Sequence, residues 1–292
     1  MGLLERLALP LAGWGAWLAR LTSAIYKMLG YPGRLLQDLL NGSFLGHTTH
    51  GLLTDAAVGA VTTLLVLDGA AVLFHAGGPG FETASLVVLG FGALSAWGAV
   101  FAGLTDHKDV DPGDGRNMAT LHGLINFIAT LGYTIAFFVR LAGGIGAARW
   151  ISLIAFVLLA SGAFIGGHLV YKYGLMVNRN AFTGGRRAKE FTPILPAAEL
   201  PEETLTKAAL GPTNLVLVRR GDVVYALKAT CSHAGGPLAE GTLKGDTITC
   251  PWHASVFRLS DGAVIHGPAQ TREIAYRARI NEGQVEVQGP IG

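Results

Sequence analysis

The sequence predicts a membrane α-helical bundle with four transmembrane helices, followed by a C-terminal all-β domain. Three observations support this fold class. Charged residues make up 14% of the chain and hydrophobic residues 50%, whereas ordinary soluble domains contain about 25% charged residues. Before residue 172 the uncharged positions gather in long stretches. After Glu190 the composition changes to short segments typical of β-strands.

Four stretches contain almost no Asp, Glu, Lys or Arg: 56–81, interrupted only by Asp68, then 83–105, 117–139 and 150–171. Each can cross about 30 Å of hydrocarbon at about 1.5 Å per helical residue. A soluble bundle would need a charged outer face, which these stretches lack. We therefore expect transmembrane helices at about 56–76, 83–105, 118–140 and 150–171.

Residues 1–45 are interrupted by charges too often to span a membrane. Trp14 and Trp17 lie among apolar residues on one side of a predicted helix, and Arg20 and Lys27 lie on the other. This pattern predicts an amphipathic arm in the membrane interface, with the helix ending at Tyr31-Pro32-Gly33. The remaining domains are then expected at 46–176 for the membrane bundle, 177–189 for a polar linker and 190–292 for the β domain.

Positive residues predict the orientation of the bundle. An even number of spans places both termini on one side, and the opposite side holds only Arg140 and Arg149. The side of the termini holds Arg6, Arg20, Lys27, Arg34, Lys108, Arg116, Lys172, Arg179, Arg186, Arg187 and Lys189. We therefore expect a bacterial-type inner membrane protein with cytoplasmic termini and a cytoplasmic β domain.

The C-terminal part reads as a small antiparallel β domain. Strands are expected at 214–219, 223–228, 247–249 and 284–288, with Gly-containing turns between them. No helix of any length is expected there.

The only two cysteines each precede a histidine, in Cys231-Ser-His233 and Cys250-Pro-Trp-His253. A single disulfide is one interpretation of two cysteines, but the neighbouring histidines favour metal binding. Two thiolates and two imidazoles suit either zinc or an iron–sulfur cluster. These four residues are therefore the candidate metal ligands.

The segment 190–289 resembles the Rieske family of [2Fe–2S] domains. The resemblance rests on the two ligand boxes, their spacing, Phe257 and Gly262, and Gly267-Pro268-Ala269, which resembles a third loop over the cluster. It implies that the two cysteines hold an inner iron and the two histidines an outer, more exposed one. It favours the cluster over zinc.

The ligand loops are similar to those of Rieske-type ferredoxins in oxygenase systems. The extra cysteine pair of respiratory Rieske subunits is absent from the sequence. Phe257 stands where high-potential members carry a Tyr that donates a hydrogen bond to a ligand sulfur, although Ser255 could supply one such bond. The resemblance implies a potential toward the low end of the Rieske range of about −150 to +300 mV.

Residues 35–175 resemble a bacterial family of four-helix membrane domains of unknown function, through Gly46-His47-Thr-Thr-His50. With cytoplasmic termini, several histidines are expected near that face. One hypothesis is a haem b bound by His122 and His168, with His50 as a substitute ligand. A quinone pocket using the same residues is the second hypothesis, and structural hydrogen bonding is the third.

Three isolated residues carry weaker signals. Asp68 is the only acid within an expected span, and His75 follows seven positions later. On a continuous helix these two would share a face, as a hydrogen-bonded pair or as part of a proton path. His266 lies beside the expected third loop and is interpreted as a surface residue.

The function expected from these features is membrane-bound one-electron transfer through a [2Fe–2S] cluster, coupling a cytoplasmic redox partner protein to haem b or quinone in the lipid bilayer. A membrane-tethered ferredoxin and a redox sensor are the alternatives. No catalytic residue is assigned, because a self-contained oxygenase needs a mononuclear iron site in a large soluble domain. The net charge of +2 and the absence of a Lys/Arg run argue against nucleic acid. The sequence does not predict an oligomeric state.

Overall fold

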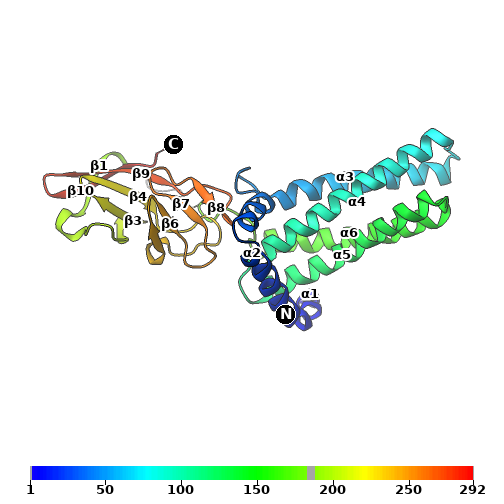
Figure 1. Ribbon diagram of the computed structural model, residues 1–292, viewed down its shortest axis with the longest axis horizontal. Coiled ribbons are helices and arrows are strands. Elements are labelled where there is room, and N and C mark those ends of the chain that lie inside the picture. Colours follow the sequence, from blue (N-terminus) through cyan, green and yellow to red (C-terminus); the bar gives the residue numbers. More distant parts are fainter. Residues whose placement is uncertain (1, 183–187, 292) are drawn as a thin grey trace. The chain divides into compact units, whose positions relative to one another are not determined.

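The computed structural model describes residues 2–182 and 188–291, and the chain forms two compact units (Figure 1). The first unit comprises Met1–Gly33 and Thr49–Leu175, and the second comprises Arg34–Thr48 and Met176–Gly292. The end of the expected N-terminal arm therefore packs with the β domain. The expected linker at 177–189 includes 183–187, which lie outside the described residues.

The N-terminal arm is helical. It consists of α1 (Leu3–Ala8), η1 (Leu9–Leu11) and α2 (Ala12–Asn41). The first helical segment of α2 ends at Gly30, next to the expected end at Tyr31-Pro32-Gly33. There φ is 61° and ψ is −128°, a conformation that glycine adopts without the steric cost of a Cβ. A second helical segment, which was not expected, continues to Asn41. The interfacial location of this arm stays a prediction.

Four helices are long and apolar enough to cross a membrane, which confirms the expected bundle: α3 (Thr49–Leu73), α4 (Pro79–His107), α5 (Asp114–Leu141) and α6 (Ile145–Tyr171). The first begins at Thr49 rather than near 56. The start of an uncharged stretch indicates where the chain begins to face lipid. The helix itself begins several residues earlier, within a polar segment.

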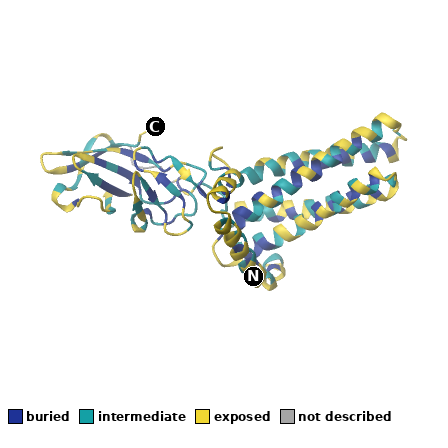
Figure 2. Ribbon diagram, viewed as in Figure 1, coloured by how far each residue is buried: buried dark blue, intermediate teal, exposed yellow. Residues whose placement is uncertain are grey.

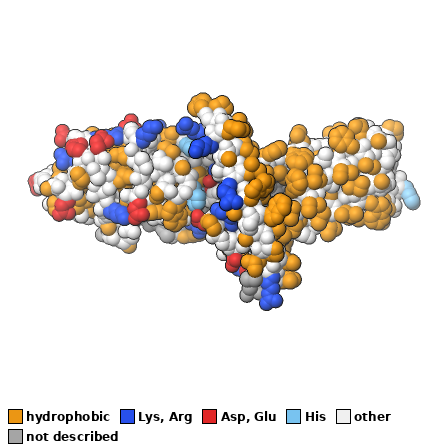
Figure 3. All heavy atoms as spheres, turned by 60° about the horizontal axis from the view of Figure 1, so that its bottom comes forward, with side chains coloured by type: hydrophobic (Ala, Val, Ile, Leu, Met, Phe, Trp, Pro, Cys, Tyr) orange, Lys and Arg blue, Asp and Glu red, His pale blue; other side chains and the backbone are white. Residues whose placement is uncertain are grey.

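Consecutive helices of the bundle pack along their lengths, while α3 and α6 touch over a shorter stretch (Figure 1). The core contains Leu64, Leu89 and Tyr133 beside alanines, whose small size lets helices approach closely. Large apolar side chains such as Leu94 and Ile154 are exposed. Many residues of the bundle helices are exposed or half-buried (Figure 2), and hydrophobic side chains cover the bundle surface (Figure 3). Such a surface suits lipid rather than water.

A buried ionic cluster joins all four spanning helices. Arg140 of α5 donates to Asp68 of α3 and to Glu82 of α4, both at 2.8 Å. Arg149 of α6 contacts the same two carboxylates, at 3.3 and 2.9 Å. Asp68 and Arg140 are 7% and 5% exposed. Two arginines and two carboxylates make up this four-residue cluster, so its net charge is zero. Buried charges are strongly destabilising unless they are paired.

The expected pairing of Asp68 with His75 is wrong. Helix α3 ends at Leu73, so His75 does not continue the helical spacing that would place it on the face of Asp68. His75 is exposed and adopts a φ of 54°. The partners of Asp68 are Arg140 and Arg149, two residues that the sequence places at the far ends of two other helices.

The C-terminal unit contains two antiparallel sheets. The six-stranded sheet has the order β1-β10-β9-β4-β3-β2 and comprises β1 (Ala188–Pro196), β2 (Thr206–Leu210), β3 (Thr213–Arg220), β4 (Val223–Lys228), β9 (Ala275–Asn281) and β10 (Gln284–Gly289). The four-stranded sheet has the order β5-β6-β7-β8 and comprises β5 (Thr242–Lys244), β6 (Thr247–Thr249), β7 (Val256–Arg258) and β8 (Val264–His266). The all-β expectation is confirmed, and η2 (Ala197–Glu199) and η3 (Leu238–Glu240) are single short 3₁₀ turns.

Two cores stabilise this unit. One packs Leu200, Leu217 and Val285 within the larger sheet. The other packs Phe257 and Ile248 around Cys231 and Cys250. The second core places both cysteines at the junction between the four-stranded sheet and the end of β4.

Candidate metal centre

Two tight loops present the four candidate ligands. In the first, the Cys231 N–H donates to the Gly236 carbonyl at 2.8 Å, and the Gly235 N–H donates back to the Cys231 carbonyl at 2.9 Å. In the second, the Cys250 N–H donates to the Ser255 carbonyl at 2.8 Å. These backbone hydrogen bonds close each loop, so the position of each ligand is set by main-chain geometry.

The two loops bring like ligands together. Cys231 and Cys250 are 1% and 3% exposed, and both are free thiols in this structure. The rings of His233 and His253 are half-buried, with centroids 5.0 Å apart and planes at 86°. The cysteine pair therefore lies inside and the histidine pair nearer the surface.

The electrostatics around the cysteines favour a thiolate. The Cys231 thiol lowers the pKa of Cys250 to about 6 by a hydrogen bond, and the backbone N–H groups of Trp252 and His253 also donate to this sulfur. The same contact with Cys250, together with burial, raises the pKa of Cys231. Thiolates are the metal-binding form of cysteine, and amide donors around a sulfur are among the features that set the potential of iron–sulfur centres.

The donor set fits a [2Fe–2S] cluster better than a single ion. Among residues 2–182 and 188–291, no three His, Cys, Asp or Glu side chains are grouped so as to hold one metal ion. A structural zinc ion takes four such ligands, whereas each iron of a Rieske centre takes two from the protein. A Cβ on Gly236 would lie 2.7 Å from Cys250 Sγ, so this glycine leaves room beside the sulfur.

A third loop, Gly267-Pro268-Ala269, lies against the second ligand loop. The Ala269 N–H donates to Ser255 Oγ at 3.0 Å, and Ser255 is fully buried. The Ser255 hydroxyl accepts in this contact, so its own proton is not used there. That proton remains available for the expected hydrogen bond from Ser255 to a ligand sulfur. Phe257 is fully buried and has no hydroxyl to donate.

Sequence reasoning missed Glu273, a fully buried carboxyl beside the first ligand loop. It accepts hydrogen bonds from the Ser232 N–H and from Asn180 Nδ2, the latter at 2.9 Å. Burial raises the pKa of Glu273 to about 8. No nearby motif marks this residue, because its role arises from a contact between segments far apart in the sequence.

Replacing Glu273 with Gln should alter how stability depends on pH. The folded carboxyl holds its proton up to about pH 8 and the unfolded one only to about 4.5, so the folded state binds more protons between these values. The free energy of unfolding of the wild type should therefore fall as pH rises from 4.5 to 8, by a few kcal/mol at most. Between pH 6 and pH 9 the melting temperature should fall less in Glu273→Gln than in the wild type. Melting temperatures that change with pH in parallel in the two proteins would contradict the prediction.

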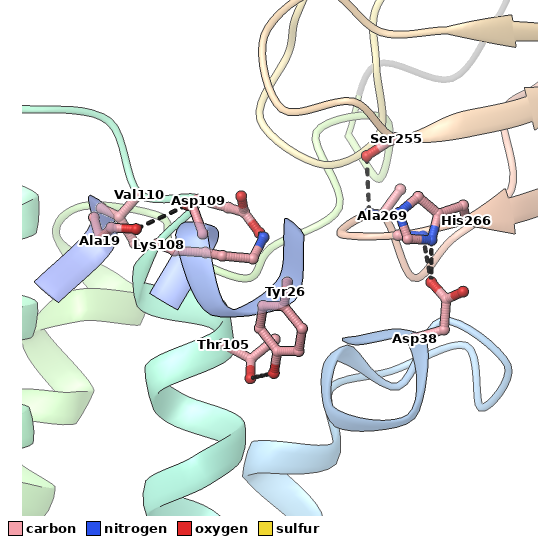
Figure 4. A network of polar contacts seen from close by, with 12 residues as sticks. Ala19, Tyr26, Asp38, Thr105, Lys108, Asp109, Val110, Ser255, His266 and Ala269 are labelled. Carbon is pink, nitrogen blue, oxygen red and sulfur yellow. Dashed lines mark hydrogen bonds and ion pairs between the residues drawn. The ribbon is translucent and has the colours of Figure 1, made fainter. Parts of the chain in front are cut away.

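The interpretation of His266 as a simple surface residue is wrong. His266 Nδ1 lies 2.8 Å from Asp38 Oδ1, and the same oxygen accepts the Gly267 N–H at 2.8 Å. Figure 4 shows Asp38, on the last part of α2, beside His266. The end of the arm therefore contacts the third loop, a pairing that no local sequence pattern indicates.

Replacing Asp38 with Ala should loosen the third loop. The variant loses the carboxylate that accepts the Gly267 N–H and lies beside His266, and this hydrogen bond is worth about 1 kcal/mol. Amide hydrogen exchange at Gly267 should become about five times faster. Asp38→Asn keeps an acceptor oxygen and serves as the control. Unchanged exchange in Asp38→Ala would show that the contact does not hold the loop.

The structure places the membrane histidines in different environments. His50 and His122 lie together, with ring centroids 6.1 Å apart, whereas the ring of His168 contacts Phe164. His107 Nε2 contacts Thr120 Oγ1 at 2.9 Å, and His47 is exposed. The structure therefore places His50, the expected substitute ligand, beside His122. In the haem or quinone hypothesis, His50 becomes a better candidate than His168 to act together with His122.

The fold and the paired ligand loops define an iron–sulfur electron-transfer domain attached to a membrane bundle. Residues 190–283 match the model of the Rieske [2Fe-2S] domain, and residues 46–179 match that of a family described as Predicted membrane protein (DUF2231). The chain is 32% identical over 97 residues to Ferredoxin CarAc of Metapseudomonas resinovorans, covering 33% of this chain and 91% of the relative. The chain belongs to the Rieske [2Fe–2S] family, which confirms the family resemblance expected for residues 190–289.

Other relatives are also ferredoxins. The anthranilate 1,2-dioxygenase ferredoxin subunit of Burkholderia cepacia is 30% identical over 98 residues, covering 34% of this chain and 91% of the relative. The solved ferredoxin of carbazole 1,9a-dioxygenase from Nocardioides aromaticivorans IC177 is 25% identical with a TM-score of 0.33, covering 35% of this chain and 99% of that one. The ferredoxin-like subtype is thus confirmed by the relatives in sequence.

Proposed function

We propose that this protein passes single electrons between a carrier in its membrane bundle and a separate redox protein, through a [2Fe–2S] cluster held by Cys231, His233, Cys250 and His253. The observation that carries the proposal is the pairing of two buried cysteines with two adjacent, half-buried histidines. When bound, such a cluster supplies reversible one-electron storage. The chain keeps the sulfur side dry and leaves the imidazole side accessible.

The surface beside His253 suits a redox partner protein. Trp252 is 53% exposed and its ring lies 6.5 Å from that of His253. An exposed aromatic side chain beside polar groups is typical of protein interfaces. One relative is named as the ferredoxin subunit of a dioxygenase, and we infer that the partner here is an oxygenase or reductase component.

The carrier on the membrane side is haem b or a quinone, bound by histidines of the bundle among His50, His122 and His168. Imidazoles within a span are costly unless they serve a function or are fully hydrogen-bonded. In the alternative, the helices only anchor a ferredoxin. In that case His50→Ala, His122→Ala and His168→Ala would each leave electron transfer intact.

We further propose that both termini and the cluster domain lie in the cytoplasm of a bacterial-type cell. The two positive residues expected on the opposite side, Arg140 and Arg149, are paired with Asp68 and Glu82. The orientation follows the number of Lys and Arg residues on each side rather than their net charge, and most of them lie on the side of the termini. A C-terminal reporter active in the periplasm would overturn this orientation.

The deciding experiment uses the purified, full-length protein in detergent. Reduction by dithionite should produce the EPR signal of a [2Fe–2S] cluster with mixed Cys and His ligands, and Cys250→Ser should abolish it. A quinol and an oxygenase-type partner should then exchange electrons with the cluster over many turnovers. An EPR-silent protein that contains zinc would refute the cluster. Slow turnover with tight, redox-dependent partner binding would support a sensor instead.

The potential of the cluster is expected toward the low end of the Rieske range of about −150 to +300 mV. Phe257 supplies no hydroxyl, so at most Ser255 adds a donor beyond the backbone amides to stabilise the more negative reduced state. Redox titration followed by EPR measures this potential. A value near +300 mV would contradict the role assigned to Phe257.

A further inference from the structure

Two histidines lie close together inside the membrane bundle. His50 comes from the first turn of α3 and His122 from α5, and their ring centroids are 6.1 Å apart with planes at 79°. A metal–imidazole bond is about 2 Å and each ring adds about 1 Å, so two imidazoles on opposite sides of one metal have centroids about 6 Å apart. The observed spacing matches that arrangement.

Hydrogen bonds orient both rings. His50 Nδ1 lies 2.8 Å from the Ala99 carbonyl on α4, and His122 Nδ1 lies 2.9 Å from the Gly162 carbonyl on α6. A carbonyl can only accept, so each Nδ1 carries the proton and each Nε2 carries the lone pair. The lone pair of His122 Nε2 faces Asn126 Nδ2 at 3.4 Å, a contact that a bound iron would replace. Metal-ligating histidines typically donate their second ring nitrogen in this way, which fixes the tautomer and the ring orientation.

The number of protein ligands selects a haem over a bare ion. Within the described ranges, no third His, Cys, Asp or Glu joins the pair to form a metal-ion group. A bare zinc or copper ion needs more protein ligands than two. A porphyrin supplies the four equatorial nitrogens itself, so that two axial imidazoles complete the coordination of its iron.

Glycines of the other two helices lie beside the histidine pair. Helices α3 and α5 lie across the bundle from each other, and α4 and α6 form the other diagonal. Gly103 of α4 lies against His50 and Gly166 of α6 lies against His122, because a Cβ on either would come within 3.0 Å of the neighbouring imidazole. α6 also contacts α3 less extensively than it contacts α5. Cofactor sites of helical bundles are built in this manner, from side chains of facing helices.

From this geometry we infer that His50 and His122 are the axial ligands of a haem b within the bundle. The inference rests on the proposed electron-transfer function and identifies its membrane carrier and both ligands. The bound haem would accept or donate one electron through its iron, matching the one-electron capacity of the cluster. His168, whose ring contacts Phe164, has no part in this site.

The test is made on the full chain, purified in detergent after expression with added haem precursor. The wild type should bind about one haem b per chain, measured as the pyridine haemochrome, with the optical and EPR spectra of a low-spin bis-imidazole iron. His50→Ala and His122→Ala should each lower the haem content at least tenfold or convert the remainder to high spin. His168→Ala and His47→Ala are matched controls that should retain both content and spectrum.

The cluster provides an independent readout in the same samples. Retention of its EPR signal in His50→Ala and His122→Ala shows that the cluster domain folds, and helical circular dichroism and size-exclusion elution equal to those of the wild type show that the bundle folds, so haem loss can be assigned to the ligands. A wild type that shows the cluster signal but takes up no haem, even on titration with haemin, overturns this inference and leaves cluster electron transfer standing. Haem that persists in His50→Ala and disappears in His168→Ala also overturns it. Loss of the cluster signal from the wild type would instead refute the proposed function.

Discussion

Replacing Arg140 with Met should lower the free energy of unfolding of the bundle by about 3–5 kcal/mol, because it leaves uncompensated buried charge. Arg140 donates to both Asp68 and Glu82. Without it, two carboxylates share the single guanidinium of Arg149. The Arg140 side chain is 2% exposed and that of Asp68 is 10% exposed, so water cannot replace the missing partner.

Two further variants test this explanation. Arg140→Met combined with Asp68→Leu removes one charge of each sign, and should recover more than half of the lost stability. Arg149→Met should cost less, because the Arg149 side chain is 23% exposed and its carboxylate partner Glu82 is 26% exposed. Unfolding in mixed micelles measures the free energies. A loss below about 1 kcal/mol in Arg140→Met would be typical of a hydrated surface pair and would show that the four-residue cluster is not buried.

Replacing Gly236 with Ala should reduce cluster content at least tenfold. The added Cβ would lie 2.7 Å from Cys250 Sγ and 3.1 Å from the Trp252 ring, so the ligand sulfur or the loop must move. Metal–thiolate bonds are about 2.3 Å and leave little freedom for such a movement. Iron and acid-labile sulfide per chain, together with the EPR signal, measure the loss.

The matched control for this substitution is Gly245→Ala, in the turn between β5 and β6. Its φ is +49°, but a Cβ there meets nothing within 4 Å. This variant bears a backbone penalty of about 1 kcal/mol without a clash, and should retain its cluster. If Gly236→Ala also retained the wild-type cluster signal, the first ligand loop could not have the geometry described here.

The organisation of the chain was largely predictable from sequence. Long uncharged stretches indicate spanning helices because hydrocarbon excludes charge, and Cys231-Ser-His233 and Cys250-Pro-Trp-His253 indicate a metal centre because each pair lies within one tight loop. Strands β3, β4, β6 and β10 were expected at nearly their observed bounds. Six of the described strands were missed: β1, β2, β5, β7, β8 and β9. Of these, β5, β7 and β8 have only three residues, too few to show an alternating pattern, and β1 contains Pro193 and Pro196, which argue against a strand in sequence.

The helix ends show where local pattern fails. The tripeptide Tyr31-Pro32-Gly33 indicated the break next to Gly30, but not the second helical segment that follows it to Asn41. Asp68 was assigned to His75 by counting along one helix. Its partners in the structure come from helices α5 and α6. Residue spacing along the chain does not indicate which helices lie beside each other.

By itself, then, the sequence determined the class of protein: four spanning helices and a Rieske domain. It also indicated four candidate ligands. Each of these is set by composition or by residues that are neighbours in the chain. Only the tertiary structure decided the pairings between distant segments. These include the ionic cluster across four helices, Asp38 against His266, Glu273 beneath the first ligand loop, and His50 rather than His168 beside His122. The reason is physical. Local sequence patterns reflect exposure to lipid and the geometry of tight loops. The burial of charged groups and imidazoles depends instead on which helices and strands become neighbours in the fold.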